Sequence, residues 1–201
     1  MKEQQTFIKI DSIISESIKS KEAMLSNPTI KGQINDCIHQ MVSAFRNGNK
    51  VLFCGNGGSA ADAQHLAAEL SGRFYMDRPA LPAEALHVNT SYLTAVANDY
   101  SFDVVYARLI EGIGHAGDIL IGMSTSGKSI NICNALQSAK GKGMFTIGLT
   151  GIQDDKMGEF CDVLIKVPTN ITPRIQECHM LIGHIICEMV EAQYFESPSE
   201  V

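Results

Sequence analysis

The sequence predicts an α/β fold: a three-layer sandwich with a five-stranded parallel sheet flanked by helices, flavodoxin-like, with two N-terminal helices before it. Short apolar runs alternate with helical patterns along residues 49–195, which is typical of parallel strands with helices on both faces. Two of these runs end in loops rich in glycine or serine that lead directly into helices. No internal repeat or linker interrupts the 201 residues, a length that suits one domain.

Two amphipathic helices are expected before the first strand. Residues 5–26 and 29–46 carry isoleucines and other apolar residues at a mostly helical spacing, and turn signals follow at Asn27-Pro28 and Gly48-Asn49. A doubly wound domain needs no such helices. Residues 1–48 are therefore expected to pack against a partner subunit in an oligomer, and residues 49–195 to form the α/β core and the C-terminal helix.

The other elements alternate along the chain. Strands are expected at Val51–Cys54, Ala85–Val88, Asp118–Met123, Met144–Leu149 and Val163–Val167. Helices are expected from the glycine loop towards Arg73 and at Ser91–Asn98, Phe102–Gly112, Ile130–Lys140, Lys156–Phe160 and Thr172–Phe195, with a frayed tail at Glu196–Val201. Right-handed crossovers would bring the loops that follow the strands to the carboxyl edge of the sheet, where such folds bind ligands.

Composition excludes several classes of function. A net charge of −6 without a Lys/Arg run argues against nucleic-acid binding. The N-terminus does not have the pattern of a signal peptide, and no apolar run approaches the length of a membrane span. The six cysteines are scattered without C-x-x-C spacing, so we expect reduced, buried thiols in a cytoplasmic protein.

The first loop, Gly55-Asn56-Gly57-Gly58-Ser59, joins a buried strand to a helix. Free backbone N–H groups and the helix dipole converge there, which favours an anion such as a phosphate. The spacing Gly55-x-Gly57-x-x-Ala60 also matches the dinucleotide fingerprint. However, the second expected strand is not followed by the carboxylate that would hold a ribose, so a nicotinamide enzyme is disfavoured. A tight turn without a ligand stays an alternative.

The second loop runs from Ser124 to Ser129 and again joins a strand to a helix. Its four hydroxyls, one glycine and exposed amides suit a phosphoryl group, which accepts many hydrogen bonds. The P-loop spacing is absent, so a nucleotide kinase is disfavoured. Two donor-rich loops at one sheet edge predict a small phosphorylated ligand between them, and the alternative for this loop is a capped helix start with solvated serines.

His65 and Glu69 lie four residues apart on one helix face, where they could hold a metal, exchange a proton or form a surface hydrogen bond. The last helix carries further polar groups, including Gln176 and His184, which makes a composite site plausible. These two are separated by a rise of about 12 Å. Both could reach one ion only if Gln176 lay at a frayed helix start, or if a neighbouring subunit supplied one of them.

Several motifs together resemble the sugar isomerase (SIS) family, and within it the isomerases of heptose phosphates. They are Gly55-Asn56-Gly57-Gly58-Ser59, His65-x-x-x-Glu69, Asn98-Asp99, Ser124-Thr125-Ser126-Gly127-x-Ser129 and Arg174-Ile175-Gln176-Glu177-x-His179, with His184 beyond. The resemblance covers nearly the whole chain. One departure is Lys128, where the serine loop of the family usually has asparagine; it adds a cation near the expected phosphate, while all four hydroxyls remain.

The resemblance implies an aldose–ketose isomerase that converts sedoheptulose 7-phosphate to D-glycero-D-manno-heptose 7-phosphate through an enediol(ate), the first step of ADP-heptose and lipopolysaccharide core biosynthesis. It also implies a cytoplasmic homotetramer with active sites shared between subunits and a zinc ion in each. The implied zinc ligands are His65, Glu69, Gln176 and His184. The implied sugar-phosphate residues are Asn56, Gly57, Gly58, Ser59, Glu69, Asn98, Asp99, Ser124, Thr125, Ser126, Ser129 and Gln176.

These residue types fit the implied chemistry, in which Glu69 is the base and His184 the acid. Moving a carbonyl between two carbons requires a carboxylate to shift a carbon-bound proton and an imidazole to shift an oxygen-bound one. A nearby metal would polarise the carbonyl. Because a carboxylate bound to zinc is a weaker base, we expect substrate binding to loosen one contact of Glu69.

Two other functions stay open. Some relatives in the same family bridge replication-initiator molecules through a tetramer surface, and the sequence resembles them across Leu93–Asp99 and His115–Leu120. Those binding proteins lack the glutamate and the late-helix histidine, which this chain has at Glu69 and His184. An isomerase of another sugar phosphate is the second alternative, because these residues define the reaction class better than the length of the carbon chain.

Overall fold

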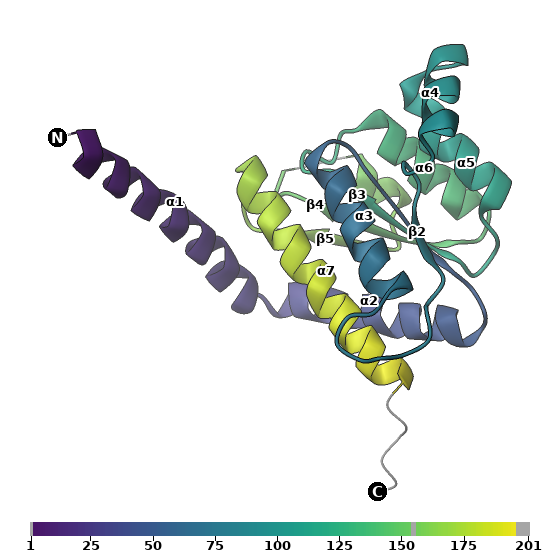
Figure 1. Ribbon diagram of the computed structural model, residues 1–201, viewed down its shortest axis with the longest axis horizontal. Helices are drawn as coiled ribbons and strands as arrows, with labels where there is room; N and C mark the ends of the chain where they lie inside the picture. Colours follow the sequence, from purple (N-terminus) through teal and green to yellow (C-terminus); the bar gives the residue numbers. More distant parts are fainter. Residues whose placement is uncertain (1, 154–155, 196–201) are drawn as a thin grey trace, which may run out of the picture.

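The computed structural model, shown in Figure 1, describes residues 2–153 and 156–195, and the expected frayed tail lies outside these ranges. Its centre is a five-stranded, fully parallel sheet in the order β2-β1-β3-β4-β5. The strands are β1 (Val51–Gly55), β2 (Ala83–Ala85), β3 (Ile119–Met123), β4 (Phe145–Thr150) and β5 (Val163–Lys166). The predicted fold class is therefore confirmed.

Helices cover both faces of this sheet. They are α1 (Lys2–Leu25), α2 (Pro28–Arg46), α3 (Gly58–Ser71), α4 (Thr90–Asp99), α5 (Val105–Ile113), α6 (Ile130–Gly141) and α7 (Thr172–Phe195), with 3₁₀ turns η1 (Phe102–Val104) and η2 (Met157–Phe160). Alternate strand residues face opposite layers. Phe53 and Ile121 pack with α2, α3 and α7, whereas Leu52 and Leu120 pack with α5 and α6.

The register of β1 against β3 places the two candidate loops side by side. Gly55 pairs with Met123 at the carboxyl ends of these strands, so the glycine loop and the serine loop begin at the same level of one sheet edge. Gly55 also allows the chain to turn sharply into α3, because a Cβ at this position would collide with the Ser59 backbone. The prediction that both loops meet at the carboxyl edge is confirmed.

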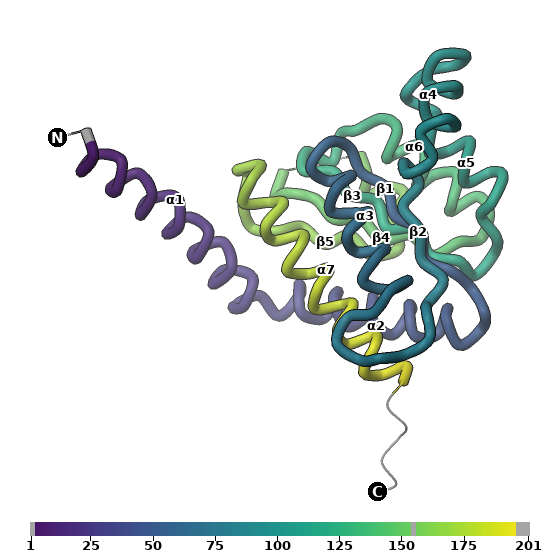
Figure 2. The backbone as a smooth tube through the Cα atoms, in the orientation of Figure 1, coloured from purple at the N-terminus to yellow at the C-terminus, as the bar shows by residue number. Residues whose placement is uncertain are grey.

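Helix α1 extends away from the body of the molecule, as Figures 1 and 2 show. At its C-terminal half it is tied to α7: Ser17 Oγ donates to Glu177 Oε2 at 2.6 Å, and Arg174 donates to the Ile13 carbonyl at 3.1 Å. Six apolar side chains along its first three-quarters are 39–62% exposed: Phe7, Ile8, Ile10, Ile13, Ile14 and Ile18. Two N-terminal helices before the first strand are thus present, as predicted.

The second strand was predicted in the wrong place. It spans Ala83–Ala85 rather than Ala85–Val88, because these three residues pair with Val51–Phe53 at the sheet edge and the chain then turns towards Asn89, which caps α4. Two predicted helices also differ. The Phe102–Gly112 segment divides into η1 and α5, and Lys156–Phe160 forms a 3₁₀ turn over Met157–Phe160 instead of an α-helix.

Candidate active site

Three side chains converge where α3 packs against α7. His65 Nε2 lies 3.1 Å from Glu69 Oε1 and 3.1 Å from His184 Nε2. One ligand atom from each of the three residues fits within a common distance of 4.8 Å. Helical spacing puts His65 and Glu69 on one face of α3, and packing of that face on α7 brings in His184. The cluster is half-buried, with Glu69 23% and His65 49% exposed.

The donor set of this cluster fits a zinc ion. Two imidazole nitrogens and one carboxylate oxygen are the ligands that zinc takes in catalytic sites, where three protein ligands leave a position for water or substrate. Tetrahedral bonds of about 2.0–2.2 Å would hold such atoms about 3.3 Å apart, close to the separations observed. His65, Glu69 and His184 are therefore able to hold the metal within one chain.

Gln176, the fourth expected ligand, lies against the glycine loop. A Cβ at Gly58 would collide with the Gln176 side-chain amide, so the glycine makes room for it. Gln176 is the fifth residue of α7 and lies in regular helix, so a frayed helix start does not bring it to His184. Both side chains nevertheless line one hollow of about 590 Å³, together with Asp62 of α3 and Lys21 of α1.

The glycine and serine loops are joined by a pair of amides. Asn56 Nδ2 donates to Asn131 Oδ1 and Asn131 Nδ2 donates to Asn56 Oδ1, each at 2.9 Å. Asn131 is buried in the first turn of α6, directly after the serine loop. Tyr106 supports the other side by donating its hydroxyl to the Gly55 carbonyl at 2.7 Å. The two loops are therefore held at a fixed spacing by neutral groups.

The serine loop opens onto the N-terminal end of α7. Ser124 is buried and its Oγ lies 3.0 Å from Ser129 Oγ, while Thr125 and Ser126 line a cavity of about 150 Å³. Thr172 and Ile175 of α7 form the facing wall. Lys128, the departure from the family pattern, is exposed, and its backbone N–H donates to Ser126 Oγ at 3.3 Å. Donor groups from two elements thus surround a phosphate-sized space.

Some predicted site residues are not brought together with the cluster. Asn98 and Asp99 are exposed at the end of α4, where the Asn98 amide donates to Asp99 at 2.9 Å. Helix α4 packs on η1 and α5 and projects away from α7 in Figure 1. Ser59 is buried in the first turn of α3. Neither Asn98 nor Asp99 lines the hollow that contains Gln176 and His184.

Sequence reasoning missed three residues of this region. Asn131 is polar at a helix start, but nothing in the sequence shows that it meets Asn56. Asp62 has a buried Oδ2 atom without a hydrogen-bond partner among the described residues, and burial raises the pKa of this carboxyl group. The Phe74 ring lies 5.8 Å from the His184 ring, from a loop that follows α3. Of these three residues, only Asp62 could have been found from the sequence, because it lies three residues before His65 in a helix.

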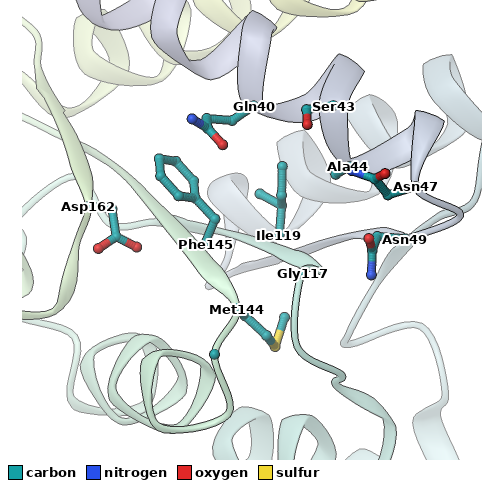
Figure 3. A pocket seen from close by; sticks show the side chains of 11 residues that line it. Gln40, Ser43, Ala44, Asn47, Asn49, Gly117, Ile119, Met144, Phe145 and Asp162 are labelled. Atoms are coloured by element: carbon teal, nitrogen blue, oxygen red, sulfur yellow. The ribbon is translucent and has the colours of Figure 1, made fainter.

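A second hollow lies at the amino edge of the sheet, away from this cluster, and Figure 3 shows its lining. It measures about 370 Å³ between the end of α2 and the starts of β3 and β4. Its one titratable lining residue, Asp162, is held by Lys140 at 3.3 Å and by Thr146, whose N–H and hydroxyl each donate at 2.9 Å. This hollow lacks the acid–base pair that proton transfer requires.

Comparisons with known proteins agree with this geometry. The SIS domain family matches residues 16–151. The phosphoheptose isomerase of Aneurinibacillus thermoaerophilus is 49% identical over 188 residues, covering 94% of this chain and 95% of the relative. Phosphoheptose isomerase 2 of Campylobacter jejuni is 49% identical over 181 residues, covering 90% of both chains.

Solved structures show the same relationship. The phosphoheptose isomerase of Neisseria gonorrhoeae superposes with a TM-score of 0.87 at 38% identity, covering 93% of this chain and 99% of that one. The phosphoheptose isomerase of Francisella tularensis superposes with a TM-score of 0.87 at 36% identity, covering 92% of this chain and 97% of that one. The arrangement of the two loops, α3 and α7 therefore belongs to a fold shared with enzymes that act on phosphorylated sugars.

Proposed function

The chain belongs to the SIS-domain family and is a sugar-phosphate isomerase, and we propose that it converts sedoheptulose 7-phosphate to D-glycero-D-manno-heptose 7-phosphate, as the first step of ADP-heptose and lipopolysaccharide core synthesis in the cytoplasm. The observation that carries the proposal is the cluster of Glu69 with two imidazoles, next to a hollow that also contains Gln176, which lies against the glycine loop. Within the described part of the chain, no helix is long and apolar enough to cross a membrane.

The phosphate end of the substrate would bind at the serine loop. Ser124, Ser126 and the neighbouring hydroxyls offer donors beside the N-terminus of α6, and a helix N-terminus favours an anion. The amide pair of Asn56 and Asn131 keeps the glycine loop next to this site. The sugar would then extend from the serine loop along the glycine loop towards Gln176 and the cluster.

Glu69 would move the carbon-bound proton. In the ketose, the carbonyl is at C2 and C1 carries two hydrogens; the carboxylate takes one proton from C1 and returns it to C2. The electron pair left by the C1–H bond forms the C1=C2 bond of the enediolate, and the C2 carbonyl electrons move to O2. When the proton is returned to C2, O1 becomes the aldehyde oxygen.

His184 would move the oxygen-bound proton, from O1 to O2, because its imidazole faces the same cluster from α7. His65, Glu69 and His184 would hold a zinc ion, with Gln176 of a neighbouring subunit as the fourth ligand, and the ion would supply Lewis-acid polarisation of the carbonyl when bound. We further propose a homotetramer with shared sites, supported by the exposed apolar face of α1 and by the position of Asn98 and Asp99 on α4, outside the hollow that Gln176 and His184 line.

The proposal is tested by incubating the zinc-loaded protein with sedoheptulose 7-phosphate and following the heptose by NMR. Glu69→Gln is expected to abolish isomerisation while zinc content stays near that of the unmodified protein. Glu188→Gln is the matched control, because Glu188 is exposed on α7 one turn after His184. An active Glu69→Gln enzyme would overturn the role of Glu69. Conversion of another sugar phosphate, but not of the heptulose phosphate, would overturn the substrate.

A binding protein for a replication initiator is the other candidate retained from the sequence. Binding proteins of that kind lack the glutamate and the late-helix histidine, whereas Glu69 and His184 of this chain meet in one cluster. This arrangement favours the enzyme, and turnover in the same NMR experiment separates the two functions.

A further inference from the structure

A buried ion pair connects the two helices that carry the cluster. The side chains of Arg78 and Glu191 are 3% and 2% exposed, and Arg78 Nε lies 2.7 Å from Glu191 Oε2. Glu191 is on α7, two turns beyond His184, and Arg78 is in the connection that follows α3. Neither residue lines the hollow that contains Gln176 and His184. The pair therefore joins α3 and α7 from outside the proposed site.

Glu191 accepts hydrogen bonds from three consecutive backbone N–H groups as well. Phe74 donates to Oε2 at 3.0 Å, and Tyr75 and Met76 each donate to Oε1 at 2.7 Å. Burial alone would raise the pKa of Glu191, but these N–H groups and the Arg78 guanidinium together lower it to about 2. The carboxylate is thus charged and fully coordinated, and it fixes the course of the loop after α3.

Arg78 continues this connection to the end of α3. Its Nη2 donates to the Glu69 carbonyl at 3.0 Å, and its Nη1 donates to the Leu70 carbonyl at 2.8 Å. Carbonyls in the last turn of a helix have no partner within the helix, so a guanidinium is well suited to bind them. The helix turn that carries the Glu69 side chain is therefore held directly by Arg78.

The same loop reaches the second reacting group. Phe74, whose N–H is bound by Glu191, places its ring 5.8 Å from the His184 ring. Phe74 is half-buried and also meets Tyr75 with ring centroids 4.6 Å apart. Glu191 thus acts on both of the proposed reacting groups: on Glu69 through Arg78, and on His184 through Phe74.

We propose that Arg78 and Glu191 are positioning residues for the isomerisation proposed above, on which this inference rests. They fix the end of α3 against α7 and hold the Phe74 ring on His184, so that Glu69 and His184 keep the mutual geometry that proton transfer needs. Displacement of reacting groups by about 1 Å can lower a rate by about 100-fold, so a small shift of this loop would affect turnover strongly.

A matched control separates positioning from general stabilisation. Asp118 is 2% exposed, pairs with Lys50 at 2.6 Å, and accepts backbone N–H bonds from Lys50 and His115. It precedes β3 at the amino edge of the sheet, away from the cluster. Glu191→Gln and Asp118→Asn each replace a buried, coordinated carboxylate by an amide, so both should lower the melting temperature.

The experiment measures kcat, KM and the melting temperature of Glu191→Gln and Asp118→Asn. The kinetic measurements are made at a temperature well below the melting temperatures of both variants. It also records the ring signal of His184 by NMR on protein labelled in its histidine rings, assigned by its loss in His184→Gln. We expect Glu191→Gln to lower kcat by about 10- to 100-fold with a smaller change in KM, and to shift the His184 signal. Asp118→Asn should retain both kcat and the signal.

Two further variants keep the test decisive if Glu191→Gln fails to fold. Phe74→Leu leaves the ion pair of Arg78 and Glu191 intact and should still shift the His184 signal and lower kcat. Glu191→Asp keeps a carboxylate, so its kcat and His184 signal should lie closer to those of the unmodified protein than the values of Glu191→Gln. Equal kcat in Glu191→Gln and Asp118→Asn, or an unchanged His184 signal in Glu191→Gln and Phe74→Leu, would overturn the proposal. If the unmodified protein does not isomerise the heptulose phosphate, the proposed substrate fails, whereas the His184 signal still decides whether the pair positions that ring.

Discussion

The Nε2 atoms of His65 and His184 lie 3.1 Å apart across the contact between α3 and α7. Two imidazole nitrogens can face each other at this distance in two ways: one donates a proton to the other, or both direct lone pairs at a shared cation. Glu69 Oε1 lies 3.1 Å from the same His65 nitrogen. A carboxylate oxygen and two imidazole nitrogens within 4.8 Å of one another favour the proposed shared cation.

Removal of the proposed zinc ion is therefore expected to abolish activity. Dialysis against a chelator should reduce turnover to background, and zinc should restore it. Zinc at about 1,000 times its dissociation constant should stabilise the folded protein by about 4 kcal/mol, seen as a higher melting temperature. His65→Gln should lower the zinc content, whereas His39→Gln, on the exposed face of α2, should leave it unchanged. Full activity in chelator-treated, zinc-free protein would contradict this prediction.

Gly58→Ala is expected to damage the site with little effect on the fold. The added Cβ would push the Gln176 amide away from the glycine loop, and we expect kcat/KM to fall by about 10- to 100-fold, equivalent to about 1.4–2.7 kcal/mol in the barrier. Gly112→Ala is the control, because a Cβ there meets nothing within 4 Å and alanine favours a helix by about 0.5–1 kcal/mol. Steady-state kinetics with unchanged kcat/KM for Gly58→Ala would refute the role of Gln176.

His179 is expected to make the protein less stable in mild acid. Its ring is fully buried, and burial lowers its pKa from 6.5 to about 4, a shift that a contact with the Thr150 backbone opposes. Between these values the unfolded chain binds a proton that the folded protein does not. The stabilisation is complete above pH 6.5 and is lost as the pH falls towards 4.

The loss from this group between about pH 7 and pH 5 amounts to about 2 kcal/mol in the free energy of unfolding. Urea titrations at the two pH values measure it. His179→Gln should lower stability at neutral pH and flatten the decline by that amount, while His115→Gln, at an exposed ring, should leave the decline unchanged. A His179→Gln variant with the full pH dependence would show that other groups cause it.

Ile14→Glu on α1 is expected to dissociate the proposed homotetramer. Ile14 is 53% exposed within a continuous apolar face, and burying a new carboxylate in a subunit interface is unfavourable. Sedimentation velocity should show a smaller species than the unmodified protein at the same concentration. Ser12→Glu adds the same charge on the opposite side of the helix and should keep the assembly. Identical sedimentation of Ile14→Glu and the unmodified protein would mean that this face is not the interface.

Local patterns were sufficient for much of the fold and part of the site. Apolar runs located four of the five strands, because a strand buried on both faces needs an unbroken apolar segment. The helical period placed His65 and Glu69 on one face, and the distance of 3.1 Å confirms that they meet. Strand β2 was misplaced because a three-residue edge strand has little periodicity, and its pairing with β1 decides where it lies.

Contacts between distant segments could not be predicted from these patterns. Asn131 and Glu191 are ordinary polar residues of helices in the sequence, and their roles depend on what the opposite element presents: Asn56 for one, and three backbone N–H groups for the other. His184 could be assigned to the cluster by resemblance alone, since periodicity does not show which face of α7 meets α3. Glu191 is 2% exposed, although glutamate is seldom buried in proteins.

The amide pair between the two loops has a further consequence for solution conditions. Asn56 and Asn131 satisfy each other's donor and acceptor and carry no charge at any pH that the protein survives. Dissolved ions screen charged contacts within about 10 Å at 0.1 M salt, but they do not weaken a neutral, half-buried pair in this way. The spacing of the glycine and serine loops at this pair is therefore set independently of ionic strength, and we expect any salt dependence of substrate affinity to come from the ligand and from exposed cations such as Lys128.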